Sequence, residues 1–140
     1  MRYINLTPHS IEVFTEMAFQ GLEQLNPSTW VATDCYTEQA VAVFPSEGSA
    51  RISVTTEDLG LGYGDIPMVA TVYGDAIGIP DCDDDDILIV SLPMQSMMKA
   101  SGHPLANQAV SPYKVVRNKI EVNGKVSSGS TCYGCMGFTK

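Results

Sequence analysis

Short apolar runs, bounded by glycine, proline, asparagine and serine, recur along the chain and predict a protein built mainly from β-strands. Pro8 lies in a turn between the first two runs, since proline fixes φ and lacks the N–H that a strand needs. We expect residues 40–44 and 51–55 to pair as a hairpin, and a turn at Gly74-Asp75 to end the strand before it. The predicted strands are residues 3–6, 11–14, 40–44, 51–55, 67–73, 76–79, 87–91, 113–116, 120–122, 125–127 and 131–138.

Two of these runs are more informative than the others. Residues 87–91 are continuously apolar up to Ser91, as in a strand that is buried on both faces. Asn123-Gly124 separates two short runs, and this dipeptide is typical of the type I′ turn of a β-hairpin. We therefore expect a buried central strand and a tight hairpin in the later part of the chain.

Helical spacing occurs in two places. Pro93 suits the first position of a helix over residues 93–100, where three methionines fall on one face, and Gly102 would cap its end. A rougher stripe of large apolar residues predicts a second short helix over residues 16–25. The sequence thus predicts a mainly β (β-rich α+β) fold, a small barrel or sandwich with one or two short helices, in a single domain covering residues 1–140.

Composition adds a prediction about the surface. The 140 residues are 44% hydrophobic, and only 17% are charged, against about 25% in typical domains. So few charges predict that part of the surface is buried between subunits of a homo-oligomer. No segment resembles a secretory leader or a membrane-spanning run. We therefore expect a cytoplasmic protein, with no membrane partner, whose four cysteines are thiols.

The charges are divided along the chain. The formal net charge is −8 at pH 7, yet fifteen of the sixteen acidic residues lie at or before Asp86, and six of the eight basic residues follow it. The overall charge opposes binding to DNA or to an anionic membrane. The basic later part could hold a small anion, or it could attract the acidic part within the fold or across an oligomer.

The string Asn5-Leu6-Thr7-Pro8-His9 resembles the start of a family of small proteins found in phages and bacterial genomes. The match excludes residues 15–38, which look like an insertion, and the aspartate run before residue 87 departs from the family pattern. The family has no established activity, so the resemblance implies a phage or prophage origin, and the host cytoplasm as location, rather than a chemistry. The further segments that match in order are residues 50–54, 65–69, 74–80, 89–91, 116–118, 123–124 and 134–138.

Cys132 and Cys135 form a C-x-x-C pair, which can supply half of a zinc site. The other half would have to come from the remaining two cysteines or the two histidines, because no second such pair exists. A thioredoxin-like role would place the motif at the start of a helix, whereas this one lies in a predicted strand. We expect plain thiols, with this pair as the candidate metal ligands.

An acidic run, Asp81 and residues 83–86, precedes the apolar strand at residues 87–91. Carboxylates bind hard cations such as Ca²⁺, but this run lacks the alternation, the glycine and the final glutamate of an EF-hand loop. We expect it to protect the exposed start of the strand from aggregation.

Cationic and polar side chains supply the candidate ligand site. Arg51 and Arg117 suit either an anion or a structural ion pair, because guanidinium groups fork onto phosphates and carboxylates. His9 could act as an acid or base, but we expect it and His103 to be turn residues whose side chains bond to the backbone. The predicted ligand-binding residues are Thr7, His9, Arg51, Tyr73, Lys114 and Arg117, with no catalytic residue assigned.

Three aromatic residues could stack on a base or pack in the core and at its rim: Trp30, Tyr36 and Tyr73. Base stacking beside cations is typical of nucleotide sites, so these rings extend the prediction of an anionic, nucleotide-like ligand.

The sequence leaves three functions open. The first is a phage accessory protein for anti-defence that uses no cofactor, binds a small anionic, nucleotide-like ligand and so sequesters a host defence signal. The second is a protein-binding or virion-associated structural module, which would have a large protein interface. The third is a small hydrolase or metal-dependent enzyme that uses His9, Cys135 or the aspartate run. The chain lacks GxSxG, Walker, HExxH and dinucleotide-binding motifs, which favours the first function over the third.

Overall fold

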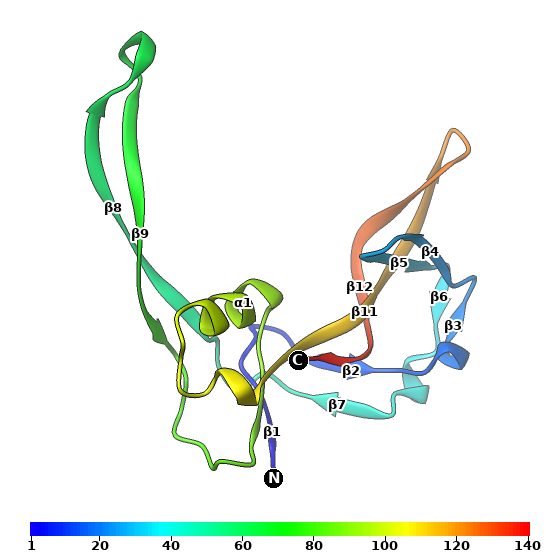
Figure 1. Ribbon diagram of the computed structural model, residues 1–140. Coiled ribbons are helices and arrows are strands. Elements are labelled where there is room, and N and C mark those ends of the chain that lie inside the picture. Colours follow the sequence, from blue (N-terminus) through cyan, green and yellow to red (C-terminus); the bar gives the residue numbers. More distant parts are fainter.

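The computed structural model describes all of residues 1–140 and confirms the mainly β fold (Figure 1). Strands hold 54% of the residues and helices 15%, and a nearly closed, barrel-shaped sheet carries the one α-helix. That helix has nine residues, and no helix is long and apolar enough to cross a membrane. The elements are β1 (Tyr3–Asn5), β2 (Ile11–Val13), β3 (Phe19–Gln20), β4 (Glu23–Asn26), β5 (Thr29–Ala32), β6 (Asp34–Cys35), β7 (Ala42–Phe44), β8 (Arg51–Leu61), β9 (Pro67–Ile77), β10 (Ile87–Ile89), α1 (Leu92–Ala100), β11 (Ala109–Val122) and β12 (Lys125–Thr139), with 3₁₀ turns at Glu16–Ala18, Thr37–Gln39, Tyr63–Asp65 and Ala106–Gln108.

β10 lies inside the main sheet, whose strand order is β1-β10-β11-β12-β2-β7, with β5 added to β11 and β4 added to β5. It pairs in parallel with β1 on one side and β11 on the other. Leu88, Ile89 and Val90 are completely buried. The prediction of a strand covered on both faces is confirmed, because β10 has neighbours at both edges as well as side chains above and below it.

The two ends of the sheet, β1 and β7, meet and nearly close the barrel. The chain that follows β7 runs along β1, where Glu47 N–H donates to the Asn5 carbonyl at 2.8 Å. Tyr3 of β1 packs on Phe44 of β7 with ring centroids 5.0 Å apart, and Phe138 of β12 lies 5.8 Å from Phe44. Aromatic contacts at such distances add to the energy of area burial, so this cluster helps to hold the ends together.

Helix α1 covers the first of two small cores. Ser91 caps its start by accepting from Met94 N–H at 3.3 Å, and Gly102 follows its end with φ +67°, so the predicted helix and its glycine cap are confirmed. The core consists of side chains from β1, β10, α1 and β11: Ile4, Leu6, Leu88, Val90, Met94, Met98 and Ala109.

The helix predicted over residues 16–25 is wrong. Only a single 3₁₀ turn forms there, and Gly21, at φ +66°, reverses the chain between β3 and β4. Met17, one member of the apparent stripe, is 83% exposed. Phe19 of the stripe is buried in a second core, which consists of Phe14, Ala18, Phe19, Ala32 and Val116, and Leu22 packs against it. β5 extends the sheet in parallel beside β11.

The predicted hairpin between residues 40–44 and 51–55 is also wrong. β7 pairs with β2, whereas β8 pairs with β9 in a separate two-stranded arm that projects from the barrel (Figure 1). β9 runs unbroken through Gly74-Asp75, so no turn ends it there. Gly74 faces an irregularity in β8, where a Cβ would collide with Ser53 Oγ, so the glycine allows close strand approach instead of reversing the chain.

The predicted hairpin around Asn123-Gly124 is confirmed. β11 and β12 pair over most of their length, and the two turn residues have φ values of +52° and +76°. Positive φ at both central positions is the geometry of a type I′ turn. This hairpin forms a second projection, at the right of the view in Figure 1, whereas the β8–β9 arm projects at the left.

Candidate functional site

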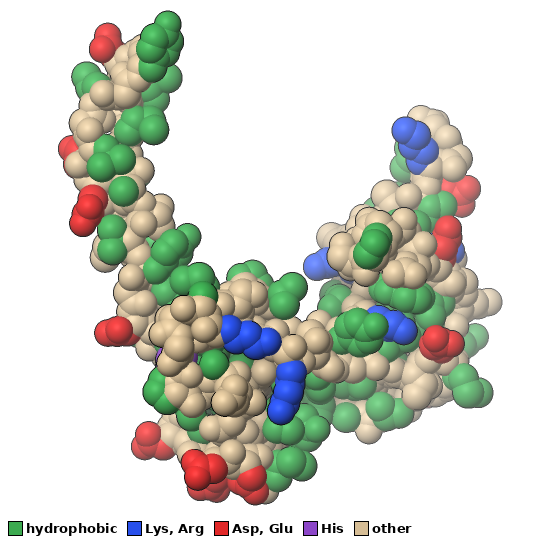
Figure 2. Space-filling view, viewed as in Figure 1, with side chains coloured by type: hydrophobic (Ala, Val, Ile, Leu, Met, Phe, Trp, Pro, Cys, Tyr) green, Lys and Arg blue, Asp and Glu red, His purple; other side chains and the backbone are tan.

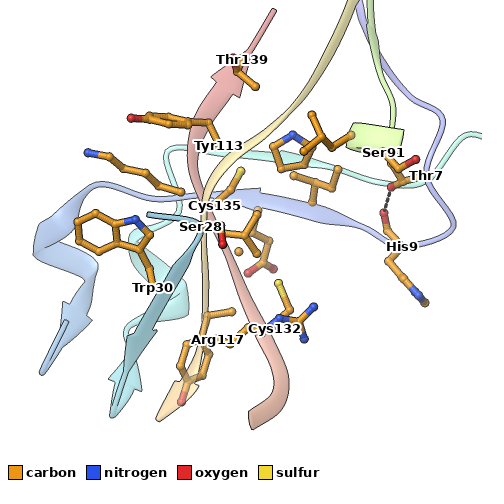
Figure 3. Close-up of a pocket in the computed structure, with 18 of the residues that line it drawn as sticks. Thr7, His9, Ser28, Trp30, Ser91, Tyr113, Arg117, Cys132, Cys135 and Thr139 are labelled. Atoms are coloured by element: carbon orange, nitrogen blue, oxygen red, sulfur yellow. Dashed lines mark hydrogen bonds between the residues drawn. The ribbon is translucent and has the colours of Figure 1, made fainter. Parts of the chain in front are cut away.

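A groove of about 930 Å³ lies along β11 and β12, between β5 on one side and the turn after β1 on the other. Four of the six predicted ligand-binding residues line it: Thr7, His9, Lys114 and Arg117. Figure 3 shows Trp30 and Tyr113 at one end of the groove and Thr7 and His9 at the other. Small-molecule sites in proteins span about 300–1,000 Å³, so this groove could accommodate a nucleotide.

Lys114 is held in an unusual backbone conformation beside this groove. Its φ is +51°, in the left-handed region that costs a residue with a Cβ roughly 1–2 kcal/mol. Its ammonium lies 5.2 Å from the centroid of the Trp30 ring and 5.5 Å from that of Tyr113. Backbone strain of this kind concentrates at ligand sites, where it orients a side chain. Here it places one cation between two aromatic rings.

Arg117 supplies a second cation on the wall of the groove. It is exposed, its recorded contact within the chain is a 3.5 Å hydrogen bond to the Ser130 carbonyl, and it forms no ion pair. Glu12 is the one acidic residue among those that line the groove. The groove therefore carries an excess of positive charge, although the whole chain has a net charge of −8.

Thr7 and His9 reach the groove through a turn built on Asn5. The Asn5 amide is completely buried and donates to the His9 carbonyl at 2.8 Å, while its oxygen accepts from Thr7 N–H at 3.0 Å. His9 takes part through its backbone, and its exposed ring forms no hydrogen bond, so the expected side-chain bond of His9 is wrong. His103 does behave as expected, because its Nδ1 accepts from Leu105 N–H at 3.1 Å.

Arg51 and Tyr73 lie outside the groove. Both belong to the β8–β9 arm, where Arg51 borders a smaller hollow beside α1 and Tyr73 is exposed. Tyr36 does not line the groove either, whereas Trp30 does. Sequence reasoning missed Tyr113, although its position directly before Lys114 in a predicted strand was a usable signal.

Cys132 and Cys135 both border the groove from β12, one exposed and one buried. Burial raises the pKa of the Cys135 thiol, which favours its protonated form, a weak ligand and a weak nucleophile. The glycine between them has a packing role, because a Cβ on Gly134 would collide with the Glu12 carbonyl and the Phe14 ring. No third metal-binding side chain joins the pair. The glycine of the motif therefore allows β12 to approach β2 closely.

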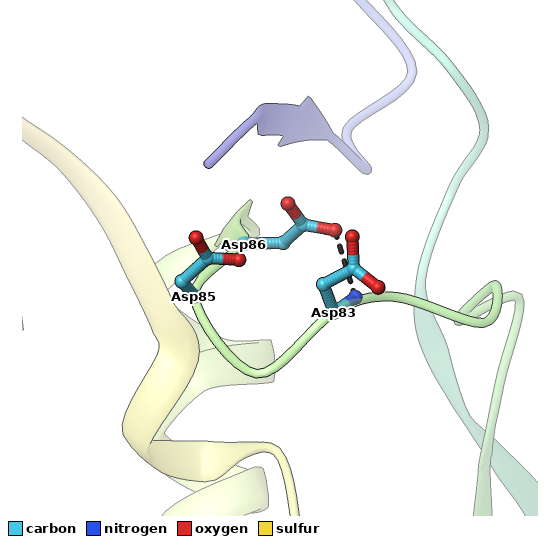
Figure 4. Close-up of side chains that lie close together, drawn as sticks. All are labelled: Asp83, Asp85 and Asp86. Carbon is cyan, nitrogen blue, oxygen red and sulfur yellow. Dashed lines mark hydrogen bonds between the residues drawn. The ribbon is translucent and has the colours of Figure 1, made fainter.

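The aspartate run secures the start of β10. Asp86 is buried, and its carboxylate accepts from Arg2 N–H at 3.0 Å and from Asp83 N–H at 2.9 Å, with the Arg2 guanidinium 3.3 Å away. The Asp83 N–H lowers the pKa of Asp86 most strongly, and Arg2 lowers it further. Carboxylate oxygens of Asp83, Asp85 and Asp86 lie within 4.8 Å of one another (Figure 4). The Asp86 carboxylate, directly before β10, is thus bonded to Arg2, directly before β1, and it acts as a clamp between the starts of these two strands.

Comparison with known proteins yields no relative: no family model, no curated protein and no solved structure matches this chain. Function is therefore inferred from the chemistry of the groove, and the resemblance to a phage family stays a prediction.

Proposed function

We propose that the chain binds a small anionic, nucleotide-like ligand in the groove along β11 and β12, and that it acts by sequestering that ligand. The observation that carries the proposal is the position of the Lys114 ammonium, 5.2 Å from the Trp30 ring and 5.5 Å from the Tyr113 ring, in a groove that Arg117 also lines. Two cations suit a phosphate, and two aromatic faces suit a base.

Stacking and charge-assisted hydrogen bonds would supply the binding energy. Base–aromatic stacking contributes about 1–3 kcal/mol per base, and hydrogen bonds to a charged group contribute about 1.5–3 kcal/mol each. Arg117 has no ion-pair partner to give up, so its interaction with a phosphate costs no internal contact of that kind. Glu12 would disfavour a second negative charge near β2, so we expect the phosphate to bind beside Lys114 and Arg117.

Binding without turnover accounts for the other polar groups of the groove. The raised pKa of Cys135 keeps its thiol protonated near neutral pH, and His9 has no hydrogen-bonded partner to orient it as a base. Sequestration needs only affinity and exclusion of solvent. If the chain has the phage or prophage origin that its N-terminal string suggests, the ligand would be a host defence signal.

A ligand screen tests the proposal. Thermal unfolding is measured with cyclic mononucleotides, cyclic dinucleotides, ADP-ribose and inorganic phosphate. A nucleotide present at about one hundred times its Kd should stabilise the chain by about 2.7 kcal/mol. Calorimetry should then give weaker binding for Lys114→Gln and unchanged binding for the matched variant Lys99→Gln, which removes an equal charge on α1. No stabilisation by any nucleotide at millimolar concentration, or conversion of the nucleotide during incubation, would overturn the proposal.

A further inference from the structure

The β8–β9 arm, residues 51–77, exposes a large apolar surface. It holds ten of the twenty large hydrophobic residues that are exposed in the whole chain, although it makes up only a fifth of the sequence. Figure 2 shows these side chains interspersed with acidic ones along the arm. The ten residues are Val54, Leu59, Leu61, Tyr63, Ile66, Met68, Val69, Val72, Tyr73 and Ile77.

Such an arm is not expected to be stable by itself. A two-stranded hairpin is marginal in water unless a third strand or another surface covers one face. Apart from their mutual pairing, β8 and β9 join no sheet, so both strands keep an unpaired edge. Uncovered edges bearing apolar side chains favour pairing with another chain. The base of the arm is covered within the chain, because Ile52 and Ala76 pack against the first core, but one copy of the chain supplies no cover for the rest of the arm.

The total surface area indicates how large that cover is. The accessible surface is 8,916 Å² for a mass of 15.1 kDa. Folded monomers of that mass expose about 7,100 Å², which leaves an excess of about 1,800 Å². A stable protein interface buries about 1,200–2,000 Å² in total. A chain that contributes two different faces, each to a different neighbour, would bury about one such total area and would remove most of the excess.

The other projection, at the tip of β11 and β12, has complementary charge and apolar side chains. The basic hairpin, residues 117–132 at the far end of β11 and β12, carries three basic residues against Glu121 and exposes Ile120 and Val122. Lys119 is paired with Glu23, which leaves Arg117 and Lys125 without an ion pair. The arm carries four acidic residues against Arg51, and none of its carboxylates has an ion-pair partner in the chain: Glu57, Asp58, Asp65 and Asp75.

We propose that the β8–β9 arm of one copy docks against the basic hairpin of a second copy, so that the chains associate head to tail. Apolar side chains on both projections would be buried together, and the acidic residues of the arm would pair with Arg117 and Lys125. Because the two docking faces differ, each chain keeps one face free for a further copy, and a ring or an open chain results. This inference requires no bound ligand, but it shares Arg117 with the groove, so a phosphate and an acidic residue of the arm would compete for that side chain.

The head-to-tail arrangement is tested by reversing the charges of the β8–β9 arm in one variant and those of the basic hairpin in another, with no ligand present. In one variant, Glu57→Lys is combined with Asp75→Lys, two exposed side chains that form no hydrogen bond within the chain. In the other, Arg117→Glu is combined with Lys125→Glu on the basic hairpin. Light scattering after gel filtration gives the mass of each, and circular dichroism confirms that each is folded.

We expect the unmodified chain to have at least twice the 15.1 kDa mass of one chain, and each variant alone to run as a single chain. An equal mixture of the two variants should assemble again, because the reversed arm then meets a reversed hairpin. Monomeric behaviour of the unmodified chain at micromolar concentration would overturn the proposal. Full assembly of the hairpin variant would also overturn it, since pairing of arm with arm needs no basic hairpin.

Discussion

The side-chain amide of Asn5 donates to the carbonyl of Phe44 at 2.7 Å, and this bond joins the two ends of the main sheet. Asn5 ends β1 and Phe44 ends β7, and 39 residues of sequence separate them. The same amide also donates to the His9 carbonyl, so it organises the following turn. One side-chain amide thus bonds two carbonyls, and it supports both the closure of the barrel and one end of the groove.

Asn5→Ala should lower the free energy of unfolding by about 2–4 kcal/mol, because it removes a completely buried amide that donates to the carbonyls of His9 and Phe44 and accepts from Thr7. His9→Ala in the same turn is the control, and it should change stability by less than about 0.5 kcal/mol, since the His9 ring is exposed and unbonded. Urea unfolding measures both. Equal effects of the two substitutions would contradict a structural role centred on Asn5.

Lys114→Gly should separate stability from binding. Glycine accepts a φ of +51° without strain, so the variant should be as stable as the original chain or more stable by up to about 1 kcal/mol. It also removes the cation between Trp30 and Tyr113, so the affinity for the nucleotide identified by the screen should fall about tenfold or more. Calorimetry and urea unfolding give the two values. Unchanged affinity would remove Lys114 from the site.

Gly134→Ala should destabilise the chain by about 2–4 kcal/mol, because the new methyl group would collide with the Glu12 carbonyl where β12 approaches β2. Gly137→Ala on the same strand is the matched control, since its methyl group would come no closer than 3.9 Å to Tyr113. Thermal unfolding of the pair distinguishes packing from a general intolerance of β12. A tolerated alanine at position 134 would show that the strands can separate.

Thiol alkylation should distinguish the two cysteines of the C-x-x-C pair. Cys132 is exposed and should react with iodoacetamide well before Cys135, whose thiol is buried and has a raised pKa. Raising the pH should speed the reaction at Cys135, because more thiolate forms as the pH approaches its pKa. Peptide mass spectrometry after timed quenching measures both sites. Faster labelling of Cys135 would mean that the groove opens further than the structure shows.

The stabilising effect of Asp86 should be lost in acid. Its pKa is lowered in the folded chain by the Asp83 and Arg2 N–H groups, so the ionised carboxylate stabilises the fold above its unfolded pKa of about 3.9. That contribution disappears as the pH falls through the folded pKa. Asp86→Asn should therefore cost stability at pH 7, and the difference from the original chain should narrow at pH 3.

Asp84→Asn is the control for this measurement, because Asp84 is exposed and has no hydrogen-bond partner within the chain. Urea unfolding at pH 7 and pH 3 compares the three proteins. A gap between Asp86→Asn and the original chain that stays constant with pH would show that the clamp works by packing rather than by charge.

Elements with local causes could be predicted from the amino-acid sequence. The Asn123-Gly124 turn, the glycine after α1 and the apolar run that became β10 were all predicted, because backbone φ preferences and side-chain burial leave direct marks on neighbouring residues. The sequence also predicted four of the residues that line the groove, since cations and a turn motif are visible as residue types.

The pairing of the strands, and the contacts between distant side chains, follow from the tertiary structure. The hairpin predicted between residues 40–44 and 51–55 was wrong, because β7 pairs with β2. The helix predicted over residues 16–25 was wrong, because Phe19 and Leu22 pack into a second core from extended and turn conformations. Lys114 reaches Trp30 across strands that are far apart in sequence. Such contacts depend on the whole arrangement of strands, and the free energy of long-range burial outweighs local preference.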